Sequence, residues 1–203
     1  MKSREEHLVE LVDETGKAHG ETTVAAAHQP PGQLHRAFSV LLVDPDGQVL
    51  LQRRAAVKTR FPLRWANSCC GHPQPGESLA EAANRRLSEE LGAGPVELTE
   101  VGIYVYYAED PATGRVEWEY DHVLLGRVTG DERLLPDPDE VAELAWVDPD
   151  VLPRSIRAEP TLYSPWLAGV INQVATAHRS GSVGAAAGQA DADGDTAERS
   201  GGR

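Results

Sequence analysis

The chain has 203 residues, 40% of them hydrophobic, which suffices for one domain with a proper core but not for two large ones. Its formal net charge of −13 argues against nucleic acid or an anionic membrane as a partner. No apolar run approaches the roughly 18 residues of a membrane span, and the first residues, MKSREE, lack the apolar segment of a signal peptide. Two adjacent cysteines, Cys69 and Cys70, cannot form a disulfide framework. We therefore expect a cytoplasmic protein, with no obligate protein partner evident.

Strands and tight turns are predicted for the first third of the chain. Strands are expected over Leu8–Asp13 and Phe38–Val43, and a turn over Asp44–Gly47 returns the chain as Val49–Arg53 to form a hairpin. The window between Gly47 and Gly76 has no acidic residue but five basic ones: Arg53, Arg54, Lys58, Arg60 and Arg64. A solvated loop is the simpler explanation for any one of them. For the window as a whole that explanation is weaker, because acids are abundant elsewhere, and an anion-binding region is favoured.

A helix is predicted over Ser78–Leu91. A Pro75-Gly76 turn precedes it, its first residue can cap it, and Gly92 ends it. At about 100° per residue, one face is apolar, formed by Leu79, Ala82, Ala83 and Leu87. Arg86 and Glu90 fall in the middle of that face, one turn apart. Because charged side chains rarely point inward without a partner or a ligand, this pair indicates a site.

Further strands and a last helix follow. Strands over Val101–Ala108 and Val116–Val128 flank a turn at Asp110–Gly114, Val141–Val147 is another strand, and Pro165–His178 is a helix. Hairpins around a central helix predict the α/β class, as an α/β/α sandwich with a mixed β-sheet.

The composition changes sharply near the end of the chain. From about residue 180 it consists largely of Gly, Ala, Ser and Asp, with almost nothing to bury. We expect one domain over residues 1–179 and a disordered low-complexity tail over residues 180–203.

Several metal-binding residue types recur between the predicted elements. Glu117 and Glu119 stand two apart in a strand, so both carboxylates share one face. On its own, a solvent-facing polar strand is the more probable explanation. With the histidines His28, His35 and His72 they make a five-ligand set of nitrogen and oxygen atoms, which suits Mg²⁺ or Mn²⁺ and also admits Zn²⁺. Sequence alone does not show that the five converge in space.

A longer pattern resembles a known family. Its positions are Gly71, Glu77, Arg85, Leu87, Glu89, Glu90 and Gly92. They resemble the Nudix box, a loop–helix–loop for metal-bound diphosphates, except that Arg86 stands where the box usually has Glu. The preceding Asn67-Ser-Cys-Cys-Gly-His-Pro73 is similar to the cysteine loop of the metal-dependent, Nudix-fold isopentenyl-diphosphate isomerases.

The resemblance implies a fold, an activity and a set of roles. The fold would be Nudix-like, and the activity would be isomerisation of isopentenyl diphosphate to dimethylallyl diphosphate in isoprenoid biosynthesis, through a tertiary cation. One divalent metal would bind His28, His35, His72, Glu117 and Glu119. A second metal, Mg²⁺, would bind Glu90 and the substrate diphosphate. The catalytic thiol precedes Gly-His, which selects Cys70 and leaves Cys69 a packing role.

The resemblance also implies substrate contacts. Arg54, Lys58 and Arg86 would contact the diphosphate, and Trp166 would close over the hydrocarbon. The catalytic groups would be Cys70 on one face of the substrate and Glu119 with Tyr107 on the other. One basic position of the family falls at Val24, and whether Lys17 replaces it is left open. The other histidines match nothing in the pattern and are expected at the surface: His7, His19, His122 and His178.

There are two alternative functions. A Nudix pyrophosphohydrolase would use the helix glutamates for its metals, but Arg86 removes one expected carboxylate and Cys70 has no part in that reaction. A non-catalytic diphosphate-binding module needs no acid and base on opposite faces. The isomerase is therefore favoured, with hydrolysis as the alternative.

Overall fold

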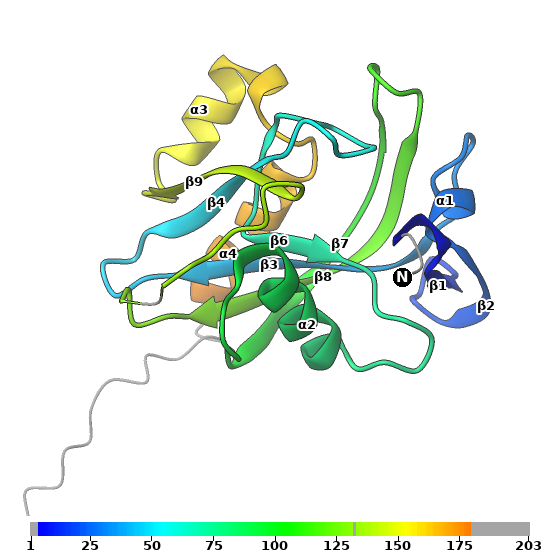
Figure 1. The fold of residues 1–203 in the computed structure, drawn as a ribbon, viewed down its shortest axis with the longest axis horizontal. Coiled ribbons are helices and arrows are strands. Elements are labelled where there is room, and N and C mark those ends of the chain that lie inside the picture. Colours follow the sequence, from blue (N-terminus) through cyan, green and yellow to red (C-terminus); the bar gives the residue numbers. More distant parts are fainter. Residues whose placement is uncertain (1–3, 132, 180–203) are drawn as a thin grey trace, which may run out of the picture.

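The computed structural model describes residues 4–131 and 133–179 (Figure 1). The predicted tail at 180–203 lies outside the described residues, so its disorder stays a prediction. In the described part, nine strands form one sheet: β1 (Leu8–Val12), β2 (Ala18–Thr23), β3 (His35–Val43), β4 (Val49–Arg54), β5 (Trp65–Ala66), β6 (Cys69–Gly71), β7 (Leu98–Glu109), β8 (Val116–Arg127) and β9 (Val141–Val147). The helices are α1 (Val24–Ala27), α2 (Leu79–Leu91), α3 (Leu152–Ala158) and α4 (Leu167–Arg179), with 3₁₀ turns η1 (Arg4–Glu6) and η2 (Pro160–Leu162).

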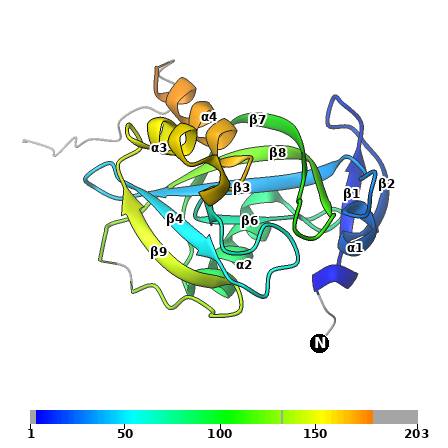
Figure 2. The same cartoon turned by 90° about the horizontal axis from the view of Figure 1, so that it is seen from above.

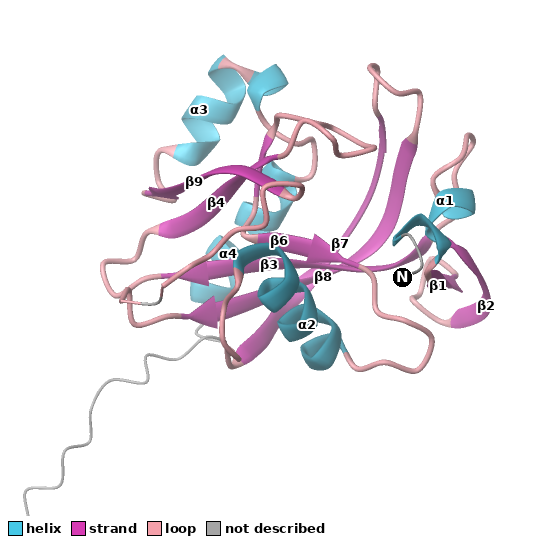
Figure 3. Ribbon diagram, in the orientation of Figure 1, coloured by secondary structure: helices cyan, strands magenta, loops and turns pink. Residues whose placement is uncertain are grey.

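The sheet is mixed, and β3 is its central strand. It pairs in parallel with β8 and antiparallel with β1, β4 and β6, while β7 extends β8 and β9 extends β4. Parallel strands need a long crossover, and here the connection between β3 and β8 contains α2 (Figure 3). This pairing sets His35 opposite Glu119 in the register. Two residues 84 positions apart in sequence therefore become neighbours at the start of β3.

Two helices cover opposite faces of this sheet, α4 on one and α2 on the other (Figure 2). Alternate residues of β3 supply the two cores: Leu41 and Val43 pack toward α4, whereas Val40 and Leu42 pack toward α2. Each fully buried aliphatic side chain stabilises the folded state by about 1.5–3 kcal/mol relative to an exposed one. The predicted α/β/α sandwich with a mixed sheet is confirmed.

Helix α2 forms as its sequence predicts. Ser78 caps it in a capping box with Glu81, and Gly92 ends it with a φ of 62°. A Cβ at Gly92 would lie 2.9 Å from Leu135 Cβ, so both the backbone conformation and the close approach require glycine. Arg86 and Glu90 are buried on its inner face, as expected.

The strands and α4 differ from expectation chiefly at their ends. The segments missed from sequence are short: β2, α1, β5, β6, α3 and the 3₁₀ turns. Their local patterns are weak because few residues define them, and β6, for example, is held by pairing with β3. None of the described helices is long and apolar enough to cross a membrane.

Candidate active site

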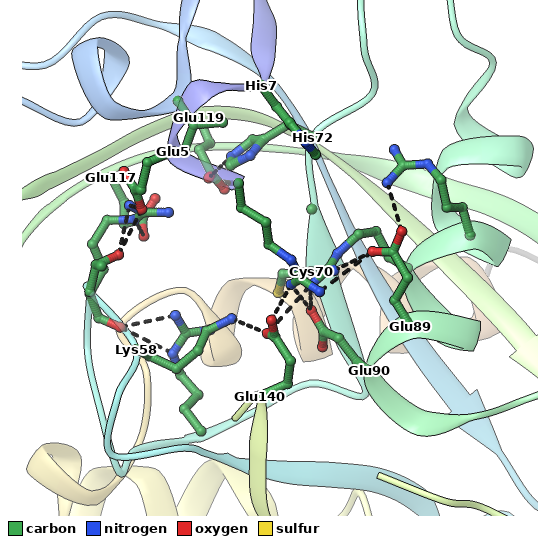
Figure 4. Close-up of a pocket in the computed structure, with 18 of the residues that line it drawn as sticks. Glu5, His7, Lys58, Cys70, His72, Glu89, Glu90, Glu117, Glu119 and Glu140 are labelled. Atoms are coloured by element: carbon green, nitrogen blue, oxygen red, sulfur yellow. Dashed lines mark hydrogen bonds and ion pairs between the residues drawn. The ribbon is translucent and has the colours of Figure 1, made fainter. Parts of the chain in front are cut away.

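A cavity of about 350 Å³ brings most of the predicted site residues together (Figure 4). Its walls come from η1, the loop after β4, β6, the inner face of α2, and the strands β7 and β8. Cys70, His72, Glu117, Glu119, Arg54, Lys58, Arg86, Glu90 and Trp166 all line it. His28 and His35 lie fully buried behind the wall.

The three predicted histidines and Glu119 form one tight group. One ligand atom from each of the four lies within 4.8 Å of the others. His28 follows α1, His35 opens β3, His72 follows β6 and Glu119 lies on β8, so only the tertiary fold assembles them. Glu119 Oε1 is 3.0 Å from His72 Nε2, 3.7 Å from His35 Nε2 and 3.9 Å from His28 Nε2.

The hydrogen bonds behind the group orient its imidazoles. His28 Nδ1 bonds the Val24 carbonyl at 2.7 Å and His35 Nδ1 bonds the Gln33 carbonyl at 2.8 Å, which directs each Nε2 toward Glu119. A hydrogen bond from the far ring nitrogen to a carbonyl fixes the tautomer of a metal-binding histidine. Among the described residues, His35 Nε2 is one of few buried polar atoms without a hydrogen-bond partner. An orphaned ring nitrogen aimed at a carboxylate fits a divalent cation.

Glu117 lies beside this group but outside it. Its Oε2 is 2.8 Å from His28 Nε2 and its Oε1 accepts from Arg60 Nε at 3.0 Å. Arg60 also pairs with Glu5 of η1 at 2.9 Å. Of the predicted five-ligand set, four groups therefore converge. The fifth, the Glu117 carboxylate, contacts the cluster through His28, and Arg60 balances its charge.

Burial and charge set the protonation of the cluster. Burial, with His72 adding to it, lowers the pKa of His35 to about 3, and burial lowers that of His72. Both rings are therefore neutral, the form that binds metals. Burial also opposes charge on His28, but Glu117 outweighs it and raises the pKa of His28 to about 9. Burial raises the pKa of Glu119, yet its interactions with the nearby rings of His28 and His72 hold it well below the ordinary value.

The tyrosine prediction was wrong by one position. Tyr107 is 54% exposed and its ring contacts Trp118 on the outer face of the sheet. Tyr106 lies opposite Glu119 in the β7–β8 register and donates to Glu119 Oε2 at 2.6 Å. Because side chains alternate along a strand, the two tyrosines must face opposite ways. A six-residue connection between the paired residues Glu109 and Val116 sets this register, and turn residues alone did not reveal it.

The two cysteines occupy different environments, as expected. Cys69 is fully buried in the core against α2, whereas Cys70 lines the cavity. Burial raises the pKa of the Cys70 thiol to about 12, with nearby Asp121 adding to it, so the group is a neutral thiol. Its Sγ donates to Asn67 Oδ1 at 3.2 Å and lies 3.7 Å from Ser39 Oγ. Ser39 in turn donates to Asp121 at 2.7 Å.

Trp166 forms an aromatic wall next to the thiol. The ring is 2% exposed and stacks on Tyr106 with centroids 5.9 Å apart. The Arg54 guanidinium carbon lies 5.5 Å from the indole centroid. Arg54 itself donates to the carbonyls of Arg60 and Phe61, so it also holds the loop after β4 in place. Phe61 has a φ of 44° in that loop, a left-handed conformation that needs such support.

The opposite side of the cavity holds a cluster of paired charges. Arg86 contacts Glu89, Glu90 and Glu140, and Lys58 Nζ lies 2.5 Å from Glu140 Oε2. Arg4 reaches the same cluster and contacts the same three carboxylates. We refer to Arg4, Lys58, Arg86, Glu89, Glu90 and Glu140 as the charged rim. The predicted diphosphate contacts Lys58 and Arg86 and the predicted metal ligand Glu90 thus lie together.

The question left open at Val24 has a structural answer. Val24 lines the cavity and is apolar, whereas Lys17 lies exposed in the turn between β1 and β2 and does not line it. Arg4, Arg60 and Arg85 are further basic side chains that do. His7 and His122 were both expected at the surface. His7 lines the cavity, and His122 is part-buried and pairs with Glu100.

Several site residues escaped sequence analysis. Asn67, Ser39, Tyr106, Arg4 and Glu140 contact the predicted groups, and Asp121 is linked to Cys70 through Ser39. Asp121 continues the period of two set by Glu117 and Glu119, a pattern that could have found it. Arg4 and Glu140 carry no local pattern, because they meet the site only through the fold.

The fold and the site together define a class. A NUDIX domain model matches residues 33–167. The crystal structure of DR0079 from Deinococcus radiodurans is similar, with a TM-score of 0.67 and 22% identity over 82% of this chain and 98% of that one. A Nudix hydrolase from M. smegmatis, RenU, has a TM-score of 0.54 at 20% identity over 85% and 94% of the two chains. These likenesses show the Nudix fold.

Sequence relatives narrow the class. An isopentenyl-diphosphate Delta-isomerase from Nocardia farcinica is 60% identical over 84% of this chain and 96% of its own length. One from Streptomyces coelicolor is 47% identical over 85% of each chain. The chain belongs to the isopentenyl-diphosphate Delta-isomerase family, and its own residues 33–167 form a NUDIX domain.

Proposed function

We propose that this protein isomerises isopentenyl diphosphate to dimethylallyl diphosphate and so supplies isoprenoid biosynthesis. The observation that carries the proposal is the composition of one cavity. It holds a neutral thiol at Cys70, a carboxylate hydrogen-bonded to a phenol at Glu119 and Tyr106, and the aromatic wall of Trp166. Binding alone does not require such a set. An alkene is a very weak base, and its protonation requires an aimed acid in a site that excludes water.

The reaction moves two protons. One proton is added to the terminal alkene carbon, which leaves a tertiary cation, and another is lost from the carbon next to the diphosphate-bearing end, which forms the new double bond. We assign the two transfers to Cys70 and to Glu119 with Tyr106, acting from different sides of the substrate. Tyr106 OH lies 2.6 Å from Glu119 Oε2 and can pass a proton along that bond. The face of Trp166 offers the cation about 0.5–2 kcal/mol of cation–π stabilisation.

His28, His35, His72 and Glu119 would hold one divalent cation, with Glu117 joining them through its place beside His28. Mg²⁺ and Mn²⁺ suit this mixed nitrogen and oxygen set, and Zn²⁺ also does. A cation bound there would stabilise the ionised Glu119 carboxylate and lower the free energy of keeping it in a dry site. The orphaned His35 Nε2 supports this assignment.

The charged rim would receive the diphosphate. Lys58 and Arg86 supply positive charge for the diphosphate, and Arg54 supplies it beside Trp166. Glu90 would bind the Mg²⁺ that accompanies the diphosphate. Holding the diphosphate keeps it from leaving as the cation forms. Hydrolysis is not favoured, because Arg86 stands where the Nudix box of a hydrolase has a further carboxylate for metal, and the Cys70 thiol has no part in that reaction.

The test is to incubate the purified protein with isopentenyl diphosphate and Mg²⁺ and to identify the product. Dimethylallyl diphosphate with no release of phosphate is the expected result. Release of inorganic phosphate or diphosphate in place of the isomer would indicate the hydrolase, and no turnover with any of Mg²⁺, Mn²⁺ or Zn²⁺ would contradict both.

A further inference from the structure

Asn67 makes an unusually complete set of contacts directly behind the cavity. It is fully buried at the start of the cysteine loop, and it does not line the cavity. Its Nδ2 donates to the carbonyl of Val40 at 3.2 Å and to that of Cys69 at 2.8 Å. Its Oδ1 accepts from Trp166 Nε1 at 3.0 Å and from Cys70 Sγ at 3.2 Å. An amide has two donors and two acceptor sites, so the side chain is fully used.

These partners leave only one orientation for the amide. Two carbonyl oxygens on one side can only accept, and the indole nitrogen on the other can only donate. A flipped amide would set its NH₂ against an N–H and its oxygen against two carbonyls. The oxygen must therefore face Trp166 and Cys70.

The same oxygen fixes the direction of the thiol. Ser39 Oγ is a second neighbour of Cys70 Sγ, but it is more distant, at 3.7 Å, and its own hydrogen goes to Asp121. A thiol has a single hydrogen, and the closer acceptor is Asn67 Oδ1. One atom thereby sets both the sulfur and the indole ring.

We propose that Asn67 is a positioning residue, whose carbonyl oxygen holds the Cys70 sulfur and the Trp166 ring at a fixed separation. This deepens the proposed function and rests on it, since the thiol moves a proton on the carbon that the ring covers. Misplacement of a reacting group by about 1 Å can reduce the rate about 10²-fold. Because Asn67 does not contact the cavity, its loss should act on kcat and leave KM little changed.

The kinetic test compares Asn67→Ala with Asn84→Ala. Asn84 is a matched control: it also bridges backbone groups, those of Ala80 and Val96, but lies on the outer side of α2. We expect kcat to fall about 10²-fold in Asn67→Ala, in line with such misplacement, with KM within about twofold, and both to stay near wild type in Asn84→Ala. Trp166→Phe keeps an aromatic face but removes the indole N–H. Its fold-reduction of kcat should therefore be smaller in the Asn67→Ala background than in the wild-type background. Additive losses, or equal kcat values in the two asparagine variants, would overturn the proposal.

A spectroscopic test needs no activity. In a Cys69→Ala background, the single S–H stretching band in the Raman spectrum belongs to Cys70. Asn67→Ala should move this band to higher frequency, and Asn84→Ala should not. Trp166→Phe retains Asn67 and is the variant to use if Asn67→Ala fails to fold. It frees the oxygen from its second donor, so the band should move to lower frequency. An unmoved band in either variant would contradict the contact, whereas a wild type without isomerase activity would contradict only the proposed function.

Discussion

The two sides of the cavity are built in different ways. The histidine cluster is held from behind: His28 and His35 are fully buried, backbone carbonyls bind their Nδ1 atoms, and Tyr106 holds Glu119. The charged rim is held by ion pairs between long side chains, and the outermost of these, Arg4 and Glu89, are 40% and 42% exposed.

The two ways of holding side chains match two different tasks, proton transfer at the histidine cluster and diphosphate binding at the charged rim. Short side chains fixed by backbone contacts lose little freedom when a cation or a proton arrives, so that side is organised for chemistry before the substrate binds. Ion pairs near solvent contribute little stability and exchange readily. The contacts of Glu89 with Arg4 and Arg86 are of this kind, and contacts with a diphosphate can replace them. We infer that changes at the first side act on kcat, and that changes at the rim act on KM.

The largest effect is expected at the thiol between the two sides. Cys70→Ala should have no detectable isomerisation, because the other proton-exchanging groups, Glu119 and Tyr106, act from the other side of the substrate in the proposed mechanism. Cys69→Ala should keep most of its activity, since Cys69 only packs against α2. Product formation over long incubations measures both, with circular dichroism to check folding. Activity in Cys70→Ala would remove the thiol from the mechanism.

The second largest effect is expected in Glu119→Gln. Its kcat should fall about 10²- to 10⁴-fold, the range for losing a general acid or base. The amide oxygen can still approach the histidines but cannot carry a proton. Diphosphate affinity should be kept, which isothermal titration with a substrate analogue would measure. If the variant turned over normally, Glu119 would be a ligand at most, and Tyr106 would become the candidate acid.

Removal of metal gives the next test. Chelator-treated protein should lose activity and regain it with Mg²⁺ or Mn²⁺. His72→Asn should weaken metal binding by more than the roughly 10- to 100-fold that loss of a second-shell partner costs, and His122→Asn should not. His122 is the matched control because it lies on β8 near the site but pairs with Glu100. Equal metal affinities in the two variants would contradict the cluster.

The smallest effect is expected at the rim. Lys58→Ala should raise KM about tenfold, the lower end of the range for a charge-assisted hydrogen bond of about 1.5–3 kcal/mol, because Arg54 and Arg86 remain, while kcat changes little. Arg53→Ala is the control: this basic residue is on β4, just before the loop that carries Lys58. It lies outside the cavity, where its Nη1 is 3.7 Å from Glu143 Oε2. A fall in kcat without a change in KM would show that the rim takes part in the chemistry, and the contrast between the two sides would fail.

The sequence by itself determined helix α2 and the types of residue in the site. Ser78, Gly92 and the apolar stripe are local features, and local propensity decides where a helix begins and ends. The inward pair Arg86 and Glu90 indicated the rim without any knowledge of its partners. The Cys70 loop is also contiguous, so its motif could be recognised directly.

Only the tertiary structure decided which groups meet. Tyr106 rather than Tyr107 faces Glu119 because the β7–β8 register, and not the composition of the turn, determines which side of the sheet each residue occupies. His35 neighbours Glu119 through parallel pairing of distant strands. Arg4, Glu140 and Asn67 gained their partners in the same way. Hydrogen bonds and ion pairs act over a few ångströms in space, whereas sequence patterns report only on neighbours along the chain.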